Sequence, residues 1–103
     1  MLTIFFHITV KTGKEQEFLD MAKRLTDVTR AEDEGCLAYI FHQQQGSPRE
    51  YVLYEQWRDG DALGAHLAHL RELLGPAAEG ENLPASLLDM CESTHSLFYD
   101  VVA

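Results

Sequence analysis

The sequence predicts an α+β fold in which one antiparallel sheet is covered by helices, in the ferredoxin-like order βαββαβ. Three observations lead to this prediction. Four segments have the composition or alternation of strands, two have apolar residues at helical spacing, and Gly-, Pro- and Asp-containing turns separate them. Their order along the chain is that of the split βαβ motif. With 103 residues, the chain is expected to form a single domain over residues 1–103.

The first strand is expected over residues 2–11, where apolar and other side chains alternate. One face takes five apolar residues, namely Leu2, Ile4, Phe6, Ile8 and Val10. The other face still carries Phe5 and His7, so we expect it not to be fully exposed to water.

A helix is expected over residues 14–33, since apolar residues recur there at three- and four-residue spacing. Gly35 suits the left-handed conformation that closes a helix. The second strand follows over residues 36–44. After a turn cluster at 45–49, the third strand is expected over residues 50–58, paired with the second as a hairpin.

Asp61 is a suitable N-cap for the second helix. Its apolar stripe consists of Leu63, Leu67, Leu70 and Leu74, and Gly75-Pro76 ends it. Residues 77–88 are compatible with a short helix or with a covering loop, and the sequence does not decide between them. The last strand is expected over residues 92–102.

Both faces of the predicted sheet carry apolar residues. In the third strand, Leu53 and Trp57 alternate with Val52 and Tyr54. Helices cover only one face in this arrangement, so the other face is expected to pack on a second copy, which predicts a homodimer.

The charge and the cysteines limit the partners and the location. The formal net charge is −9, which argues against nucleic acid or an anionic membrane as partner. No apolar run approaches the roughly 20 residues that cross a bilayer. Cys36 and Cys91 are too few for a disulfide scaffold and begin strands at opposite sheet edges, so we expect free thiols and a cytoplasmic protein.

The stretch 51–66 holds the main candidates for chemistry. A strand ending in Trp57 is followed by a short connection and by a helix with His66 on its second turn, so indole and imidazole meet at one end of the sheet. Either they line a pocket or they complete the core. His66 lies at the edge of the predicted stripe, where it suits a general base or a structural histidine. Glu55 shares a strand face with Trp57 and could form an ion pair or a Glu–His dyad with His66.

Three motifs carry a resemblance to a known family: Glu34-Gly35-Cys36-Leu37-Ala38-Tyr39, Tyr51-Val52-Leu53-Tyr54-Glu55-Gln56-Trp57 and Ala62-Leu63-Gly64-Ala65-His66-Leu67. In this order and spacing the chain resembles the antibiotic biosynthesis monooxygenase (ABM) domain family, in particular its YgiN-like quinol monooxygenases. The resemblance covers about Leu2 to Leu74. It implies a dimeric α/β barrel with a ligand cleft between each sheet and its helices, and oxygenation of quinols or polyketide anthrones by O2 without metal or flavin.

The resemblance leads us to predict a cofactor-independent monooxygenase that acts with O2 on a small aromatic substrate, quinol-like or phenolic. His66 would be base or orienter and Glu55 the supporting carboxylate, while four aromatic residues would contact the substrate: Trp57, Phe6, Tyr39 and Tyr54. Two alternatives remain open: a non-catalytic small-molecule-binding or stress-response module, and an enol isomerase or decarboxylase.

No metal or cofactor is expected. His66 and His69 are three residues apart and could share a metal, but two histidines make a weak signal, and His69 is expected to point further toward solvent. Haem-degrading relatives rely on an Asn in the first strand, a Trp on the second helix and a haem-ligating His at that helix's end. Here those places hold Phe6, His66 and the Leu74-Gly75-Pro76 region, so haem degradation is not expected.

Overall fold

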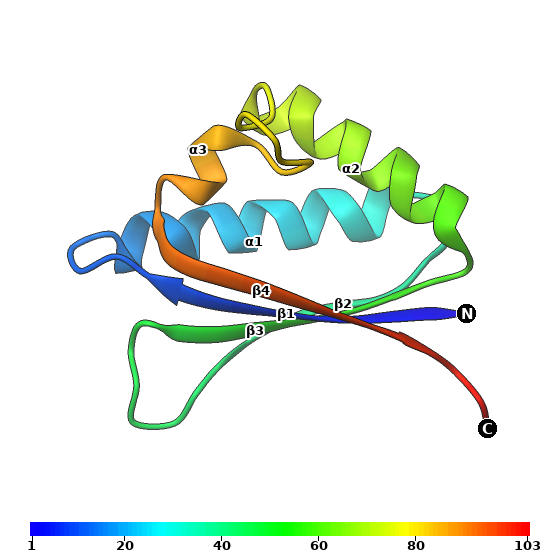
Figure 1. The fold of residues 1–103 in the computed structure, drawn as a ribbon, viewed down its shortest axis with the longest axis horizontal. Helices are drawn as coiled ribbons and strands as arrows, with labels where there is room; N and C mark the ends of the chain where they lie inside the picture. The colour runs from blue at the N-terminus through cyan, green and yellow to red at the C-terminus, as the bar shows by residue number, and fades with distance from the viewer.

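The computed structural model describes residues 1–103 and shows a four-stranded antiparallel sheet with all helices on one side (Figure 1). The elements are β1 (Leu2–Val10), α1 (Glu15–Glu32), β2 (Cys36–Gln43), β3 (Glu50–Trp57), α2 (Gly60–Leu74), α3 (Ala85–Leu88) and β4 (Cys91–Asp100). The strand order across the sheet is β2-β3-β1-β4. The predicted ferredoxin-like fold is therefore confirmed, with the short α3 added before the last strand.

The register of β1 and β3 decides which side chains face the helices. Leu2 lies opposite Trp57, Ile4 opposite Glu55 and Phe6 opposite Leu53. Alternate residues of both strands are buried under the helices: Ile4, Phe6, Ile8, Val10, Tyr51, Leu53, Glu55 and Trp57. The strand face that Glu55 shares with Trp57 is thus the one that the helices cover.

Gly35 allows α2 to approach the start of β2. Its φ of +85° is readily adopted only by glycine, and a Cβ built on it would lie 2.7 Å from the Cβ of Ala62. Ala62 is buried at the first turn of α2. This close contact fixes how α2 is rotated against the sheet.

The structure corrects two details of α2. Its N-cap is Asp59, whose Oδ1 accepts a hydrogen bond from the backbone N–H of Ala62 at 2.9 Å, and not Asp61. The extended backbone of Asp59 places its carboxylate over the first turn, where Asp61 already lies inside the helix. The buried line of α2 is Ala62, His66 and Leu70. His66 thus occupies the centre of the buried face rather than its edge, and Leu63 and Leu67 lie on the flank.

Residues 75–90 combine the two alternatives that the sequence left open. A loop is closed by a bridge between Ala77 and Pro84, and the short α3 follows. None of the helices is both long enough and apolar enough to cross a bilayer. Cys36 and Cys91 are free, and they lie on opposite edge strands as expected.

The sheet face opposite the helices is uncovered and partly apolar. Across its middle, Ile40, Tyr54, Phe5 and Leu97 lie side by side on the four strands. The rings of Phe5 and Tyr54 stack with centroids 5.5 Å apart, and Tyr99 packs edge-on against Phe5. The exposed fraction of Phe5, Ile40 and Leu97 is between 36% and 39%.

Candidate active site

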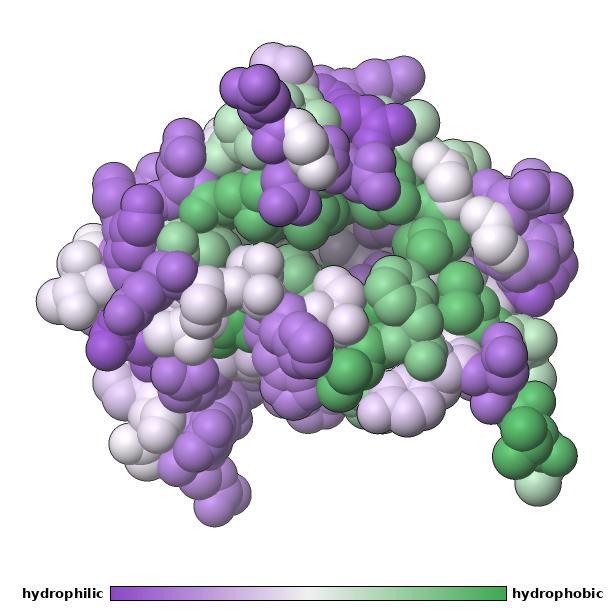
Figure 2. All heavy atoms as spheres, in the orientation of Figure 1, coloured by the Kyte–Doolittle hydropathy of each residue, from purple (hydrophilic) through white to green (hydrophobic).

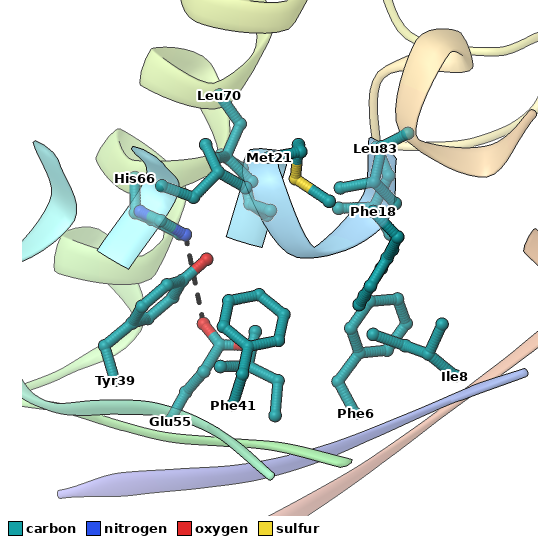
Figure 3. A pocket seen from close by; sticks show the side chains of 14 residues that line it. Phe6, Ile8, Phe18, Met21, Tyr39, Phe41, Glu55, His66, Leu70 and Leu83 are labelled. Atoms are coloured by element: carbon teal, nitrogen blue, oxygen red, sulfur yellow. Dashed lines mark ion pairs between the residues drawn. The ribbon is translucent and has the colours of Figure 1, made fainter. Parts of the chain in front are cut away.

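A small cavity of about 30 Å³ lies between the sheet and the helices (Figure 3). Apolar side chains form most of its wall, among them Phe6, Ile8, Phe18, Phe41, Leu70 and Leu83. Three polar side chains meet at one end of it. Figure 3 shows Glu55 and Tyr39 rising from the sheet and His66 descending from α2. The cavity is thus apolar except for one polar end.

Glu55 is a nearly buried carboxyl group with one clear donor. The indole Nε1–H of Trp57, which is fully buried, donates to Glu55 Oε1 at 3.0 Å. Burial raises the pKa of Glu55 from 4.5 to about 7, although the hydrogen bond from Trp57 opposes the shift. Glu55 can therefore hold or release a proton near neutral pH.

His66 is 2% exposed and is enclosed by aromatic rings. Its ring centroid lies 4.5 Å from that of Trp57 and 5.2 Å from that of Tyr39. Burial lowers the pKa of His66, and hydrogen bonding to Asp33 opposes this shift. His66 Nε2 faces Glu55 Oε1 at 3.9 Å, which is too long for a hydrogen bond. An oxygen atom could lie about 2.8 Å from each of them, so the gap suits one hydroxyl group.

Asp33 joins the two histidines of α2. Its Oδ2 lies 2.5 Å from His66 Nδ1 and its Oδ1 lies 2.5 Å from His69 Nδ1. The Asp33 side chain is only 8% exposed, and the carboxylate raises the pKa of His69 through this hydrogen bond. His69 points further toward solvent than His66, as the helical spacing predicts, since its side chain is 22% exposed and that of His66 is 2% exposed. It is nevertheless bonded to Asp33.

An open groove of about 180 Å³ reaches the same polar end from outside. It shares Phe6, Glu55, Leu67 and Leu83 with the small cavity, and Ile4 and Phe98 extend it along the sheet. Figure 2 shows a hollow between the helical layer and the sheet, with hydrophobic residues gathered around it. Glu55 thus borders both spaces and marks where a bound molecule would meet the polar end.

The structure brings together five of the six residues predicted for the site. Trp57 contacts both His66, through its ring, and Glu55, to which it donates a hydrogen bond. The small cavity is lined by Glu55 and His66 and also by Tyr39 and Phe6. Tyr54 is not brought there. It alternates with Leu53 and Glu55 and so lies on the uncovered face, stacked on Phe5.

Asp33 is the site residue that the sequence reasoning missed. In a split βαβ fold the end of the first helix, the end of the third strand and the start of the second helix lie at one end of the sheet. A carboxylate just before the second strand is therefore a candidate partner for a histidine on the second helix, and this signal was available.

No three or more His, Cys, Asp or Glu side chains are arranged to hold a metal ion.

Comparison with known proteins gives a consistent result. The sequence profile of the family described as "Antibiotic biosynthesis monooxygenase" matches residues 1–71, which confirms the resemblance found in the three motifs. "Putative monooxygenase YcnE" of Bacillus subtilis (strain 168) is 34% identical over 92 residues, which are 87% of this chain and 93% of that protein.

Solved structures agree on the fold. A conserved protein from Methanosarcina mazei Go1 is similar with a TM-score of 0.77 and 25% identity, over 95% of this chain and 89% of the other. A mutant of SnoaB, a cofactor-independent oxygenase from Streptomyces nogalater, is similar with a TM-score of 0.75 and 19% identity, over 97% and 91% of the two chains.

Proposed function

Since the chain belongs to the antibiotic biosynthesis monooxygenase family, we propose that it oxygenates a small quinol-like or phenolic substrate with O2 and without a cofactor. The observation that carries this proposal is the pair of acceptor atoms at the polar end of an apolar cavity, His66 Nε2 and Glu55 Oε1, 3.9 Å apart. SnoaB, a cofactor-independent oxygenase, shares the fold, which supports the absence of a cofactor in the proposal.

His66 is the base in the proposed reaction. Its lowered pKa leaves the imidazole neutral near pH 7, so Nε2 can take the proton of a substrate hydroxyl held in the gap. The resulting anion is electron-rich enough to pass an electron to O2. One oxygen atom then enters the ring, the other leaves as water with the protons released, and the substrate supplies all the electrons. A quinol thereby becomes a hydroxyquinone.

The surroundings of His66 favour this chemistry. The substrate ring would lie in the groove between Phe6, Leu67 and Leu83, with its hydroxyl directed at Glu55. Water is kept out by the apolar wall, so the anion interacts with fixed protein groups. Tyr39, whose pKa is raised well above its usual value by burial, stays a neutral phenol that can donate a hydrogen bond to the anion.

The proposed molecule is a homodimer in which a second copy covers the open sheet face. That face carries Phe5, Ile40, Tyr54, Leu97 and Tyr99. A contiguous apolar surface of this kind marks an interaction site in a protein of this size. Tyr54 would then serve the dimer contact rather than the substrate.

Oxygen uptake with a panel of quinols and phenols tests the proposed reaction. His66→Gln should lower the rate by about 10²–10⁴-fold, the usual contribution of a positioned base, because glutamine fills the space without a basic nitrogen. Glu55→Gln should also lower the rate, whereas Glu17→Gln on the exposed side of α1 should not. Equal rates in wild type and His66→Gln would remove His66 from the chemistry.

A further inference from the structure

We propose that Asp33 is a positioning residue, whose carboxylate holds His66 with the Nε2 lone pair facing the cavity. This proposal rests on the proposed function, because it concerns how His66 is prepared to act as a base. Nothing in the three motifs that define the resemblance includes Asp33. The role follows from the contacts of Asp33, from its burial and from its place at a helix end.

The tautomer of His66 follows from the chemistry of its partner. An ionised carboxylate only accepts hydrogen bonds, so the proton of His66 must be on Nδ1, which lies 2.5 Å from Asp33 Oδ2. In neutral imidazole the other nitrogen is then unprotonated. That nitrogen is Nε2, which faces Glu55 and the cavity. Without Asp33, the Glu55 carboxylate, whose Oε1 lies 3.9 Å from Nε2, would favour a proton on Nε2, which is the wrong tautomer for a base.

Three hydrogen bonds, apart from the one to His66, hold Asp33 in place. Its backbone N–H donates to Thr29 O at 3.0 Å, and its backbone carbonyl accepts from Cys36 N–H at 3.3 Å. His69 Nδ1–H donates to Oδ1, so the carboxylate is fixed at both oxygens. A chain of contacts therefore runs from the backbone at the end of α1 to the reacting nitrogen of His66.

The location of Asp33 argues against a purely structural role. Asp33 is the C-cap of α1, and a negative charge at a helix C-terminus is unfavourable because the helix dipole is negative there. Its side chain is also nearly buried, which costs free energy for a charge unless it is paired. Asp33 is therefore a carboxylate in an unfavourable position, at a helix C-terminus and nearly buried. Such a departure from local sequence preferences, next to a candidate base, is typical of a functional site.

Two substitutions separate the hydrogen bond from the charge. Asp33→Ala removes the acceptor, so the Nε2–H tautomer should predominate in His66 and the oxygenase rate should fall by about 10²–10⁴-fold. Asp33→Asn keeps an oxygen that can accept from Nδ1–H but removes the charge. It should therefore keep the tautomer and retain far more of the rate. Asp27→Asn, exposed on the same helix, is the control.

The pH profile gives a second readout. The rate should rise with pH as His66 loses its proton, and the Asp33 charge holds the pKa of His66 higher than burial alone would. In Asp33→Asn the midpoint should therefore move to lower pH. Glu55 and Trp57 on β3, Tyr39 on β2 and His69 on α2 also face His66 and are kept in this variant. The pKa of His69 falls as well, because the Asp33 carboxylate raises it in the wild type.

The experiment is ¹⁵N NMR of histidine-labelled protein at neutral pH, together with rate–pH profiles. Ring ¹⁵N shifts show which nitrogen carries the proton, and they do so in the resting protein. Wild type should show His66 protonated on Nδ1, and Asp33→Ala should show it on Nε2. An unchanged tautomer in Asp33→Ala would overturn the proposal, as would an unmoved pH midpoint in Asp33→Asn if Asp33→Ala does not fold. If either of these two negative results is found and His66→Gln still loses activity, the proposed function stands. Only the positioning role of Asp33 is then rejected.

Discussion

At the scale of single residues, Glu55 has a measurable effect on stability. Its pKa is about 7 in the folded protein and 4.5 in an exposed carboxyl group, so the folded state binds more protons between these values. Stability from this group is therefore fully present below pH 4.5 and is lost as the pH rises to 7. The loss amounts to about 3 kcal/mol, from the energy of one pKa unit.

The measurement is the difference in unfolding free energy between wild type and Glu55→Gln as a function of pH. Glutamine can still accept from Trp57 but does not titrate, so the wild type should weaken relative to the variant across this range. Both chains keep His66 and His69. A difference for Glu55→Gln that does not change with pH would mean that Glu55 titrates as an exposed group.

Single residues also show what could be read from the sequence. Two-residue alternation correctly placed Glu55 and Trp57 on one face. The same alternation places Tyr54 on the opposite face, so the prediction that Tyr54 contacts the substrate did not agree with it. The contact of Asp33 with His66 joins positions 33 residues apart. Alternation and helical spacing describe neighbours along the chain, so neither pattern reports such a contact.

At the scale of elements, the close packing of α2 against the start of β2 depends on Gly35. Gly35→Ala should destabilise the protein for two reasons: alanine at positive φ costs about 1–2 kcal/mol, and its Cβ would lie 2.7 Å from that of Ala62. Gly46→Ala is a matched control, since Gly46 also has positive φ but no atom within 4 Å of the added carbon. Chemical denaturation should show a clearly larger loss for Gly35→Ala. Equal losses of stability in the two variants would mean that α2 does not pack closely against Gly35.

The same contact explains why the sequence placed His66 at the edge of its helix. The leucines of α2 define a stripe by helical spacing, but the small Ala62 packed on Gly35 sets the actual rotation of the helix. A small residue such as Ala62 contributes little to a hydrophobic pattern in the sequence, although small residues allow helices and strands to approach most closely. The element order and most boundaries could be predicted because turns and periodicity are local features.

At the scale of the whole molecule, the open sheet face predicts a dimer. Light scattering at micromolar concentration should give twice the chain mass of 11.7 kDa. Phe5→Lys should shift the mass to that of one chain, because Phe5 lies at the centre of the apolar face and a lysine there would bury a charge. Gln16→Lys on the exposed surface of α1 should leave the mass unchanged. A wild-type mass of 11.7 kDa would contradict the dimer.

The most direct test of the proposed oxygenation is turnover of a quinol under ¹⁸O2, with product and water analysed by mass spectrometry. We predict one labelled oxygen atom in the product and the other in water, at a rate that His66→Gln lowers by about 10²–10⁴-fold. A product without the label would contradict the account, and deuterium uptake from solvent without O2 consumption would identify an enol isomerase. Tight binding of quinols with no O2 uptake would identify a binding module that uses the same cleft.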